Sequence, residues 1–459
     1  MIQTVEVDKF GGTSLSSAKL DRSALERVLA KKAQLPDDAT LVLVCSGTGV
    51  GEDTAREKKA TDWGYELING NQSARDVMES IFRRNLQGHS FDTVNGLDQV
   101  LEDLQQTDYS GEHAARIIGS PERIKGRTLH HALQQQGIPS VFLDYYENGM
   151  VGMQTDNNID VPIDHQRTLN TITQIGRARE LKGKIVVLPG FVGTNPKGEM
   201  VTLERGMSDG TATYWGAALY ADEVRIWSDN NGISPVDPTI IPGLDPIRLL
   251  TYREAEAFAG LGARIINDVA IRPSRERGTK VRILNSFEPN NGGTLITANL
   301  MLEHYGVKAV AHVPGHYVIS VDNMSMTKKG VARKVSNIFS DCEINIESEA
   351  DGDSCRSYAV FPNGNLGKLQ TALEKAGHRT ETINRISRIA LVGEGMNMLR
   401  RTRDKTARRI LFDVLDDRGI DDLMDSRARG SVMLSAFIRE EYTTQAVMYL
   451  TRELGFLKP

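Results

Sequence analysis

Cysteine is scarce in this chain of 459 residues, and Cys45, Cys342 and Cys355 stand far apart. Because none belongs to a Cys-x-x-Cys pair, the sequence predicts neither a zinc site nor a disulfide framework, and we expect a reducing, cytoplasmic setting. Long apolar runs are missing too, since no segment approaches the roughly 18 uninterrupted apolar residues of a membrane span. The N-terminus begins as a strand without a basic segment and an apolar segment before it, so we expect no signal peptide.

Neither sign of charge dominates the chain. It has 55 basic and 60 acidic residues, which gives a net charge of −5. This balance provides no general attraction to nucleic acids or to anionic membranes, so neither is an expected partner. Apolar residues make up 40% of the chain, enough for a large core. The length predicts roughly two to four domains.

Residues 1–300 alternate short apolar runs with helical patterns, which predicts a mainly parallel α/β sheet. The predicted strands are Thr4–Asp8, Thr40–Cys45, Ser140–Asp144, Lys184–Pro189, Val224–Ser228 and Lys280–Leu284. The predicted helices are Ser16–Gln34, Ile124–Gln136, Thr211–Leu219, Ile247–Gly260 and Ala263–Val269. The polar stretch from Asp53 to Gln106 favours helix and is predicted to be a helical insertion, to which the pattern assigns no role.

After residue 300 the pattern changes to two similar series of about 70 residues, each with a βαββαβ-like order. The first opens with Val307–Asp322, predicted as strand, turn and strand, and the second opens with the strand Arg388–Val392. We therefore predict two ferredoxin-like modules at 305–380 and 385–459. Such a pair more often serves regulation or dimerisation than catalysis, and a single α+β domain without a ligand is the alternative.

A glycine turn with a lysine follows the first predicted strand, as Lys-Phe-Gly-Gly-Thr-Ser at positions 9–14. Glycines let backbone N–H groups approach phosphate oxygens, and Lys9 can neutralise charge that shifts during phosphoryl transfer. The helix predicted from Ser16 would add its positive end at the same point. The same residue types also occur in ordinary strand–turn–helix connections, so both interpretations stay open for this motif alone.

Two further polar loops follow strands in the same region. Residues 203–211 precede a helix, and Arg205 offers a planar fork suited to a carboxylate or a phosphate, although Ser208 and Asp209 could simply cap the helix. A later strand ends at Ser228 and Asp229, where ligands of open α/β sheets bind. A turn-rich connection would explain one such loop but not three in one sheet.

Together these segments resemble the aspartate kinase branch of the amino-acid kinase family, over nearly the whole chain. The family's Lys-Phe-Gly-Gly-Thr-Ser is intact at 9–14, and its Gly-Phe-Ile-Gly is Gly-Phe-Val-Gly at 190–193. Its Thr-Leu-Gly-Arg-Gly-Gly-Ser-Asp is Thr-Leu-Glu-Arg-Gly-Met-Ser-Asp at 202–209, and its Gly-Gly-Thr-Leu stands at 292–295. The resemblance implies the amino-acid kinase fold over residues 1–300, a mainly parallel sheet sandwiched by helices, followed by two tandem ferredoxin-like ACT modules.

The resemblance also implies a reaction, the first step of aspartate-derived amino-acid biosynthesis. The β-carboxylate of L-aspartate attacks the γ-phosphate of ATP with Mg²⁺, giving 4-phospho-L-aspartate and ADP. Such a site must hold two anions together, and two unit charges about 4 Å apart repel by ~1 kcal/mol in water and ~4 kcal/mol at an effective dielectric of about 20. The resemblance further implies a homodimer or a higher homo-oligomer, and it assigns no residue of the chain as a metal ligand.

The residue roles come from the resemblance, position by position. Lys9 and Asp209 are the implied catalytic residues: Lys9 contacts the transferring phosphate, and Asp209 orients Lys9. The implied substrate-binding residues are Ser46, Glu122 facing the ammonium, Phe191, Arg205 clamping the α-carboxylate, and Ser208. The implied ATP-binding residues besides Lys9 are Gly11, Gly12, Ser14, Ser228, Asp229, Ser234, Asp237 and Arg264. An amino-acid effector loop is implied at Met324, Met326, Lys329 and Gly330.

Departures from the family pattern indicate a divergent branch. Glu204 and Met207 replace family glycines, so Glu204 adds a negative charge beside Arg205 and Met207 would narrow the pocket. Two other functions therefore stay open: a kinase acting on another amino acid or carboxylate, and a weakly catalytic amino-acid sensor. The strand after the effector loop is unusually acidic, so the ACT modules could serve only as a dimer interface. We expect no homoserine dehydrogenase domain.

Overall fold

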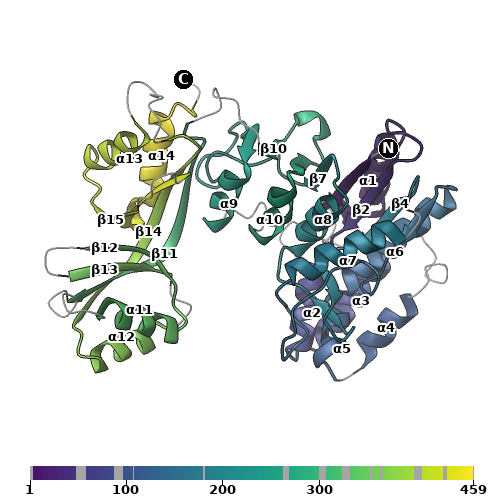
Figure 1. Cartoon of the computed structure of the whole chain (residues 1–459), viewed down its shortest axis with the longest axis horizontal. Helices are drawn as coiled ribbons and strands as arrows, with labels where there is room; N and C mark the ends of the chain where they lie inside the picture. The colour runs from purple at the N-terminus through teal and green to yellow at the C-terminus, as the bar shows by residue number, and fades with distance from the viewer. Residues whose placement is uncertain are drawn as a thin grey trace. The chain divides into compact units, whose positions relative to one another are not determined.

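The computed structural model describes residues 4–47, 58–86, 97–106, 108–178, 181–261, 268–298, 306–322, 331–351, 355–361, 365–396, 406–426 and 432–457. It divides into two compact units (Figure 1). The first comprises residues 1–233, 248–255 and 264–299, and the second comprises residues 234–247, 256–263 and 300–459. None of the helices in the described part combines the length and apolarity that a membrane crossing requires.

The first unit is built on a sheet with the strand order β3-β4-β2-β1-β7-β9-β10-β8. All neighbouring pairs run parallel except β9 and β10. The strands are β1 (Val5–Phe10), β2 (Thr40–Cys45), β3 (Ser140–Phe142), β4 (Ile185–Pro189), β7 (Glu223–Ser228), β8 (Leu249–Thr251), β9 (Lys280–Asn285) and β10 (Thr294–Thr297). Strands β1, β2 and β4 are buried along their whole length, because helices cover both faces of the sheet. The predicted parallel α/β sheet is thus confirmed.

Helices cover this sheet on its two faces (Figure 1). Leu41 and Leu43 of β2 pack with α1 and α6, while the alternate residues Val42 and Val44 point to the opposite face, where α8 crosses β1 and β2. The helices of residues 1–298 are α1 (Ala18–Lys32), α2 (Ala60–Ile68), α3 (Ser73–Asn85), α4 (Leu97–Gln105), α5 (Gly111–Ile118), α6 (Ser120–Gln135), α7 (His165–Ala178), α8 (Met207–Ala218), α9 (Tyr252–Gly260) and α10 (Asp268–Arg277). A short hairpin consists of β5 (Val192–Thr194) and β6 (Met200–Thr202).

The predicted helical insertion is confirmed where it is described. Helices α2, α3 and α4 share an apolar cluster with Ile117 of α5 and Ile124 of α6, in which Leu67, Met78 and Phe82 are fully buried. The cluster attaches the insertion to the start of α6. It thereby places α2 beside Glu122, which belongs to α6.

The helix predicted at Ile247–Gly260 is wrong in its first part. Leu249–Thr251 forms β8, which pairs with β10, and α9 begins only at Tyr252. The local reason is reciprocal capping: the Thr251 N–H donates to Glu254 Oε2 at 2.7 Å, and the Glu254 N–H donates to Thr251 Oγ1 at 3.1 Å. This pair of bonds fixes the helix start after the strand.

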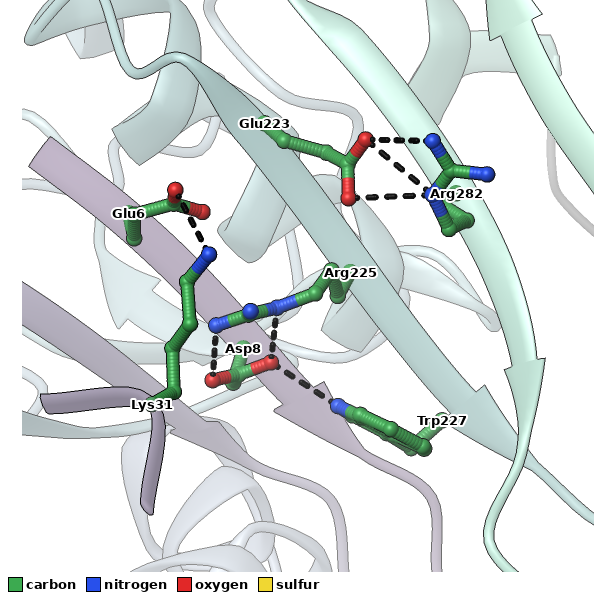
Figure 2. A network of polar contacts seen from close by, with 7 residues as sticks. All are labelled: Glu6, Asp8, Lys31, Glu223, Arg225, Trp227 and Arg282. Atoms are coloured by element: carbon green, nitrogen blue, oxygen red, sulfur yellow. Dashed lines mark hydrogen bonds and ion pairs between the residues drawn. The ribbon is translucent and has the colours of Figure 1, made fainter. Parts of the chain in front are cut away.

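A buried ion pair joins β1 to β7 in the middle of the sheet (Figure 2). Arg225 donates two hydrogen bonds to Asp8, at 2.7 and 2.6 Å, and Trp227 Nε1 donates a third to the same carboxylate at 2.8 Å. Two residues before Asp8 on β1, Glu6 pairs with Lys31 of α1. Two residues before Arg225 on β7, Glu223 pairs with Arg282 of β9. Burial raises the pKa of the Glu6 carboxyl, which Arg225 and Lys31 partly oppose. The two strands that the network joins are those that end in the glycine turn and in the Ser228 loop.

The second unit contains an antiparallel sheet with the order β12-β13-β11-β14-β16-β15. Its strands are β11 (Ala309–Asp322), β12 (Ile346–Asp351), β13 (Cys355–Val360), β14 (Thr380–Val392), β15 (Asp422–Ser426) and β16 (Met433–Arg439). Besides residues 256–260 of α9, its helices are α11 (Val331–Asp341), α12 (Leu366–Lys375), α13 (Ala407–Asp416) and α14 (Thr443–Glu453). Helices α11 and α12 pack on one core, which contains Phe339, and α13 and α14 pack on another, which contains Leu411.

The strand–turn–strand prediction for Val307–Asp322 is wrong, because β11 is one long strand. Its pairing with β14 shifts register between Val313, His316 and Val318, and Gly315 lies in that irregular stretch with φ of 88°. A bulge therefore takes the place of the expected turn. The first half of β11 contributes Val310 to the core of α13 and α14, and the second half contributes Ile319 to the core of α11 and α12. Both series of elements share β11 and β14, so the module boundaries at 380 and 385 stay a prediction.

Candidate active site

Several predicted site residues meet at one edge of the first sheet. Strands β4, β2, β1 and β7 are consecutive neighbours and run parallel, so their carboxyl ends lie side by side. Phe191, Ser46, Gly11 and Ser228 are at or just beyond these ends. Ligands of open α/β sheets bind at this edge, which is therefore the candidate active site.

Lys9 and Asp209 form the ionic centre of this edge. Lys9 lies near the end of β1 and Asp209 in the first turn of α8, and Lys9 Nζ is 2.6 Å from Asp209 Oδ1. Both side chains are mostly buried, at 11% and 14% exposure, so the pair is held in place while some access remains. A lysine ammonium positioned by a carboxylate can stabilise charge on a neighbouring phosphate.

The glycine turn lies directly beside this ion pair. The Gly11 N–H donates to the carbonyl oxygen of Trp227 at 3.0 Å, and a Cβ at Gly11 would lie 3.3 Å from that oxygen and 3.8 Å from Lys9 Nζ. Glycine therefore keeps this space open next to the ammonium, as a phosphate cradle requires. Gly12 and Ser14 belong to the same turn, and the buried Ser14 hydroxyl contacts that of Ser286 at 2.6 Å. The Ser14 N–H already donates to Gly11 O at 3.0 Å.

Glu122 is a buried carboxylate with one unpaired oxygen. Its Oε1 accepts hydrogen bonds from the Gly47 N–H at 3.0 Å and from Thr61 Oγ1 at 3.4 Å. Its Oε2 is buried and has no hydrogen-bond partner among the described residues. Burial raises the pKa of Glu122 to about 8, and hydrogen bonds to the carboxylate oppose that rise. A buried carboxylate oxygen without a donor fits a ligand that brings an ammonium group.

The loop after β2 is tied to both of these groups. The Ser46 N–H donates to Phe10 O at 3.1 Å, which continues the pairing of β1 and β2. A Cβ at the next residue, Gly47, would lie 2.6 Å from Glu122 Oε1, so a side chain at this position would displace the carboxylate. Ser46 is thus placed between the glycine turn and Glu122.

The turn after β4 presses against the start of α8. Phe191 is buried and has φ of 67°, which is strained for a residue with a side chain. Its N–H donates to Thr211 Oγ1 at 3.3 Å. A Cβ at Gly190 would lie 2.9 Å from the Cβ of Ser208, so these two residues are in close contact. Phe191 and Ser208 are therefore brought together with Asp209.

Arg205 is engaged by residues that the sequence did not single out. Its guanidinium lies 2.5 Å from Asp62 and stacks 4.6 Å from the ring centre of Tyr65, and both partners belong to α2. Thr61 of the same helix turn contacts Glu122. Sequence reasoning missed these three residues because they lie in the helical insertion, and no local pattern marks them as functional.

The side chain of Met207 packs against its own helix, α8. Its side chain is fully buried, and a Cβ at Gly210 would lie 2.3 Å from its Cε. The methionine therefore folds back over Gly210, in the space that the absent side chain leaves. This contact accounts for a long side chain at position 207.

The predicted nucleotide residues fall into three groups. Ser228 accepts a backbone hydrogen bond from Ser286 at 2.8 Å, next to the Ser14–Ser286 contact, and Asp229 follows it on the surface. Ser234 and Asp237 belong to the second unit, where each stabilises a local turn. The third group is Arg264 alone, which lies outside the described residues, as do the predicted effector residues Met324, Met326, Lys329 and Gly330. Among the described residues, no group of three or more His, Cys, Asp or Glu side chains is placed to hold a metal ion.

Comparison with known proteins agrees with this architecture. The model of the amino acid kinase family matches residues 5–285. Aspartokinase from Geobacillus stearothermophilus is 24% identical over 98% of this chain and 97% of its own length, and aspartokinase from Corynebacterium glutamicum is 27% identical over 85% and 83%. Aspartokinase 2 of Arabidopsis thaliana, a chloroplastic protein, is 23% identical over 97% and 83%.

Two solved structures have the same fold over nearly the whole chain. Aspartate kinase from Clostridium acetobutylicum superimposes with a TM-score of 0.79 at 19% identity and covers 98% of this chain and 100% of its own. Aspartokinase III of E. coli in complex with aspartate and ADP has a TM-score of 0.78 at 20% identity and covers 98% and 99%. Since the family model matches more than half of the sequence, the chain belongs to the amino acid kinase family.

Proposed function

We propose that the protein is an ATP-dependent aspartate kinase that transfers the γ-phosphate of ATP to the β-carboxylate of L-aspartate. The observation that carries this proposal is the juxtaposition of the Lys9–Asp209 pair with the open glycine turn at Gly11. The unpaired oxygen of Glu122 adds a place for a substrate ammonium. The relatives named above are aspartokinases, and the E. coli structure contains aspartate and ADP, which supports the same assignment.

In this reaction the protein must position the two substrates and stabilise the charge that develops during phosphoryl transfer. A carboxylate oxygen of aspartate forms a bond to the γ-phosphorus while the bond from that phosphorus to the bridging oxygen breaks, which gives 4-phospho-L-aspartate and ADP. The aspartate carboxylate is already a nucleophile, so no covalent enzyme intermediate and no general base are required. The principal barrier is the repulsion between the two anions, which Lys9 reduces as charge moves toward the leaving oxygen.

Each group has one task in this scheme. Gly11 and Gly12 let backbone N–H groups approach the phosphates, and Asp209 keeps the Lys9 ammonium in place. Glu122 holds the substrate ammonium, Arg205 the α-carboxylate, and Phe191 with Ser208 lines the pocket. Mg²⁺ would arrive with the nucleotide and neutralise its phosphate charge. We further propose that the protein acts in the cytoplasm as a homo-oligomer and that an amino acid binds the second unit as an effector.

The test is ATP turnover by the purified chain with Mg²⁺, with and without L-aspartate, with the acyl phosphate trapped as a hydroxamate. We expect ADP release that depends on aspartate, together with the hydroxamate. Equal ADP release in the two samples and no hydroxamate would contradict the proposal. The same assay with L-glutamate and β-alanine in place of aspartate establishes which carboxylate is accepted.

A further inference from the structure

Helix α2 contacts both groups that would recognise the amino-acid end of the substrate. Within its first turn, Thr61 lies 3.4 Å from Glu122 and Asp62 lies 2.5 Å from Arg205. These two partners are the proposed ligands of the substrate ammonium and α-carboxylate, and they come from α6 and from the loop before α8. The insertion thus supplies one wall of the acceptor subsite.

Asp62 offers Arg205 the same chemical group as the substrate does. Its carboxylate approaches the guanidinium as the α-carboxylate of an amino acid would, and the stacked ring of Tyr65 holds the guanidinium on that side. The Tyr65 hydroxyl in turn donates to Asp160, which fixes the ring. Arg205 is therefore already oriented toward a carboxylate, although this carboxylate is that of Asp62 and not that of a substrate.

From this geometry we propose that Asp62 is a specificity-determining residue that competes with the α-carboxylate of the substrate for Arg205. The inference rests on the proposed function. The Arg205 and Asp62 side chains are 61% and 33% exposed, so water screens the pair and a ligand can displace it. Asp62 lowers the affinity for the amino acid to the extent that its own pairing with Arg205 must be broken first.

The effect of this competition on the affinity for aspartate can be estimated from the strength of exposed ion pairs. Exposed ion pairs of this kind are weak, and their loss corresponds to about a two- to five-fold change in an equilibrium constant. Removing the charge of Asp62 should therefore tighten binding of L-aspartate by about that factor, with a smaller gain at high salt. The lysine–phosphate chemistry is untouched, so kcat should change less than KM.

The central variant is Asp62→Asn, which removes the charge but keeps a side-chain oxygen. That oxygen matters because Asp62 Oδ2 also accepts a hydrogen bond from the Lys59 N–H, at 3.3 Å, at the start of α2. The matched control is Asp76→Asn, since Asp76 stands in the first turn of the next helix, α3, and forms no ion pair with Arg205. Thermal unfolding of each variant confirms that the fold is retained.

Binding of L-aspartate is measured by isothermal titration calorimetry, and KM and kcat by the hydroxamate assay. We expect the Kd for aspartate to fall about two- to five-fold in Asp62→Asn and to stay unchanged in Asp76→Asn. The gain should disappear in an Arg205→Gln background, and it should be absent for inhibition by β-alanine, which lacks the α-carboxylate. These two comparisons separate competition for Arg205 from a general effect of charge.

Three results would overturn the proposal. The first is an unchanged or weakened affinity in folded Asp62→Asn, while the wild-type chain binds and phosphorylates aspartate. The second is an equal gain in the Arg205→Gln background or with β-alanine. The third is a wild-type chain that neither binds aspartate nor forms hydroxamate, which would refute the proposed function and the competition together.

Discussion

The Nζ of Lys9 and the Oδ1 of Asp209 lie 2.6 Å apart at the junction of strand β1 and helix α8. The contact connects the glycine turn to the helix that also carries Ser208, so one ion pair fixes the phosphate side against the acceptor side of the edge. If the pair serves phosphoryl transfer, its removal should affect turnover far more than folding.

We expect Lys9→Met to lower kcat by at least about a hundredfold, as loss of one preorganised charge at a transition state does. The hydroxamate assay measures turnover, and thermal unfolding verifies the fold. Lys31→Met is the matched control, because Lys31 pairs with Glu6 elsewhere on β1 and should leave turnover within about twofold of wild type. A folded Lys9→Met variant with normal turnover would refute the role of this lysine.

Glu122 should make binding of the amino acid depend on pH. Its pKa of about 8 in the ligand-free chain means that the carboxyl is largely protonated at pH 6, whereas an ammonium ligand needs the carboxylate. Affinity for aspartate should therefore rise with pH, by up to about tenfold per unit, until pH reaches about 8. Titration calorimetry in buffers of different ionisation enthalpy should show proton release on binding below that pH. Glu122→Gln, if folded, should bind aspartate weakly at every pH, without this slope.

The same carboxyl should make the free protein less stable as pH rises. Its folded-state pKa lies above the ordinary value of 4.5, so the folded state holds a proton that the unfolded state has lost. Its contribution to stability is thus complete below pH 4.5 and is lost as pH rises toward about 8. Glu122→Gln should flatten this part of the pH dependence of the unfolding free energy. An unchanged slope in the variant would show that Glu122 ionises normally in the folded chain.

The buried pair between Asp8 and Arg225 should be a stability determinant (Figure 2). Among the described residues, Arg225→Met leaves Trp227 as the one remaining donor to the buried Asp8 carboxylate, and such a loss typically costs about 3–5 kcal/mol. Arg282→Met is the matched control, since its partner Glu223 is 20% exposed and the loss should stay below about 1 kcal/mol. Denaturant unfolding measures both. Equal effects of the two substitutions would argue against a special role for the buried pair.

Met207 and Gly210 should be coupled through packing. Gly210→Ala places a methyl group 2.3 Å from Met207 Cε, so we expect it to cost about 1–3 kcal/mol of stability. Met207→Ala combined with Gly210→Ala should recover part of that loss, because the methionine no longer fills the space. A double-mutant cycle by thermal unfolding gives the coupling free energy. Additive effects would mean that the two side chains do not compete for that space.

Local signals explain how much of the fold could be predicted. The apolar runs of β2 and β4 and the glycine turn after β1 lie in short, continuous stretches, so the local sequence pattern predicts them. Strand β8 has only three residues, and its existence depends on pairing with β10, which no local pattern reveals. The start of β14 includes the polar residues Glu381, Asn384 and Arg385, so the apolar pattern predicts only the later part of this strand.

The same distinction holds for the candidate site. Lys9, Gly11 and Asp209 belong to motifs that are continuous in the sequence, and the structure brings them together. Thr61 and Asp62 reach Glu122 and Arg205 only because the apolar cluster of the insertion docks α2 near the start of α6. Such contacts arise from tertiary packing, and no spacing in the sequence encodes them.

Strands β11 and β14 join the two series of elements in the second unit into one sheet. Each runs through both halves of the sheet, so Val310 and Ile319 of one strand belong to different cores. A gene fusion or truncation that kept only the first series of elements would end before β14 and would leave β11 with an open edge where its longest pairing should be. The two halves can therefore be exchanged between proteins only together, as a single module.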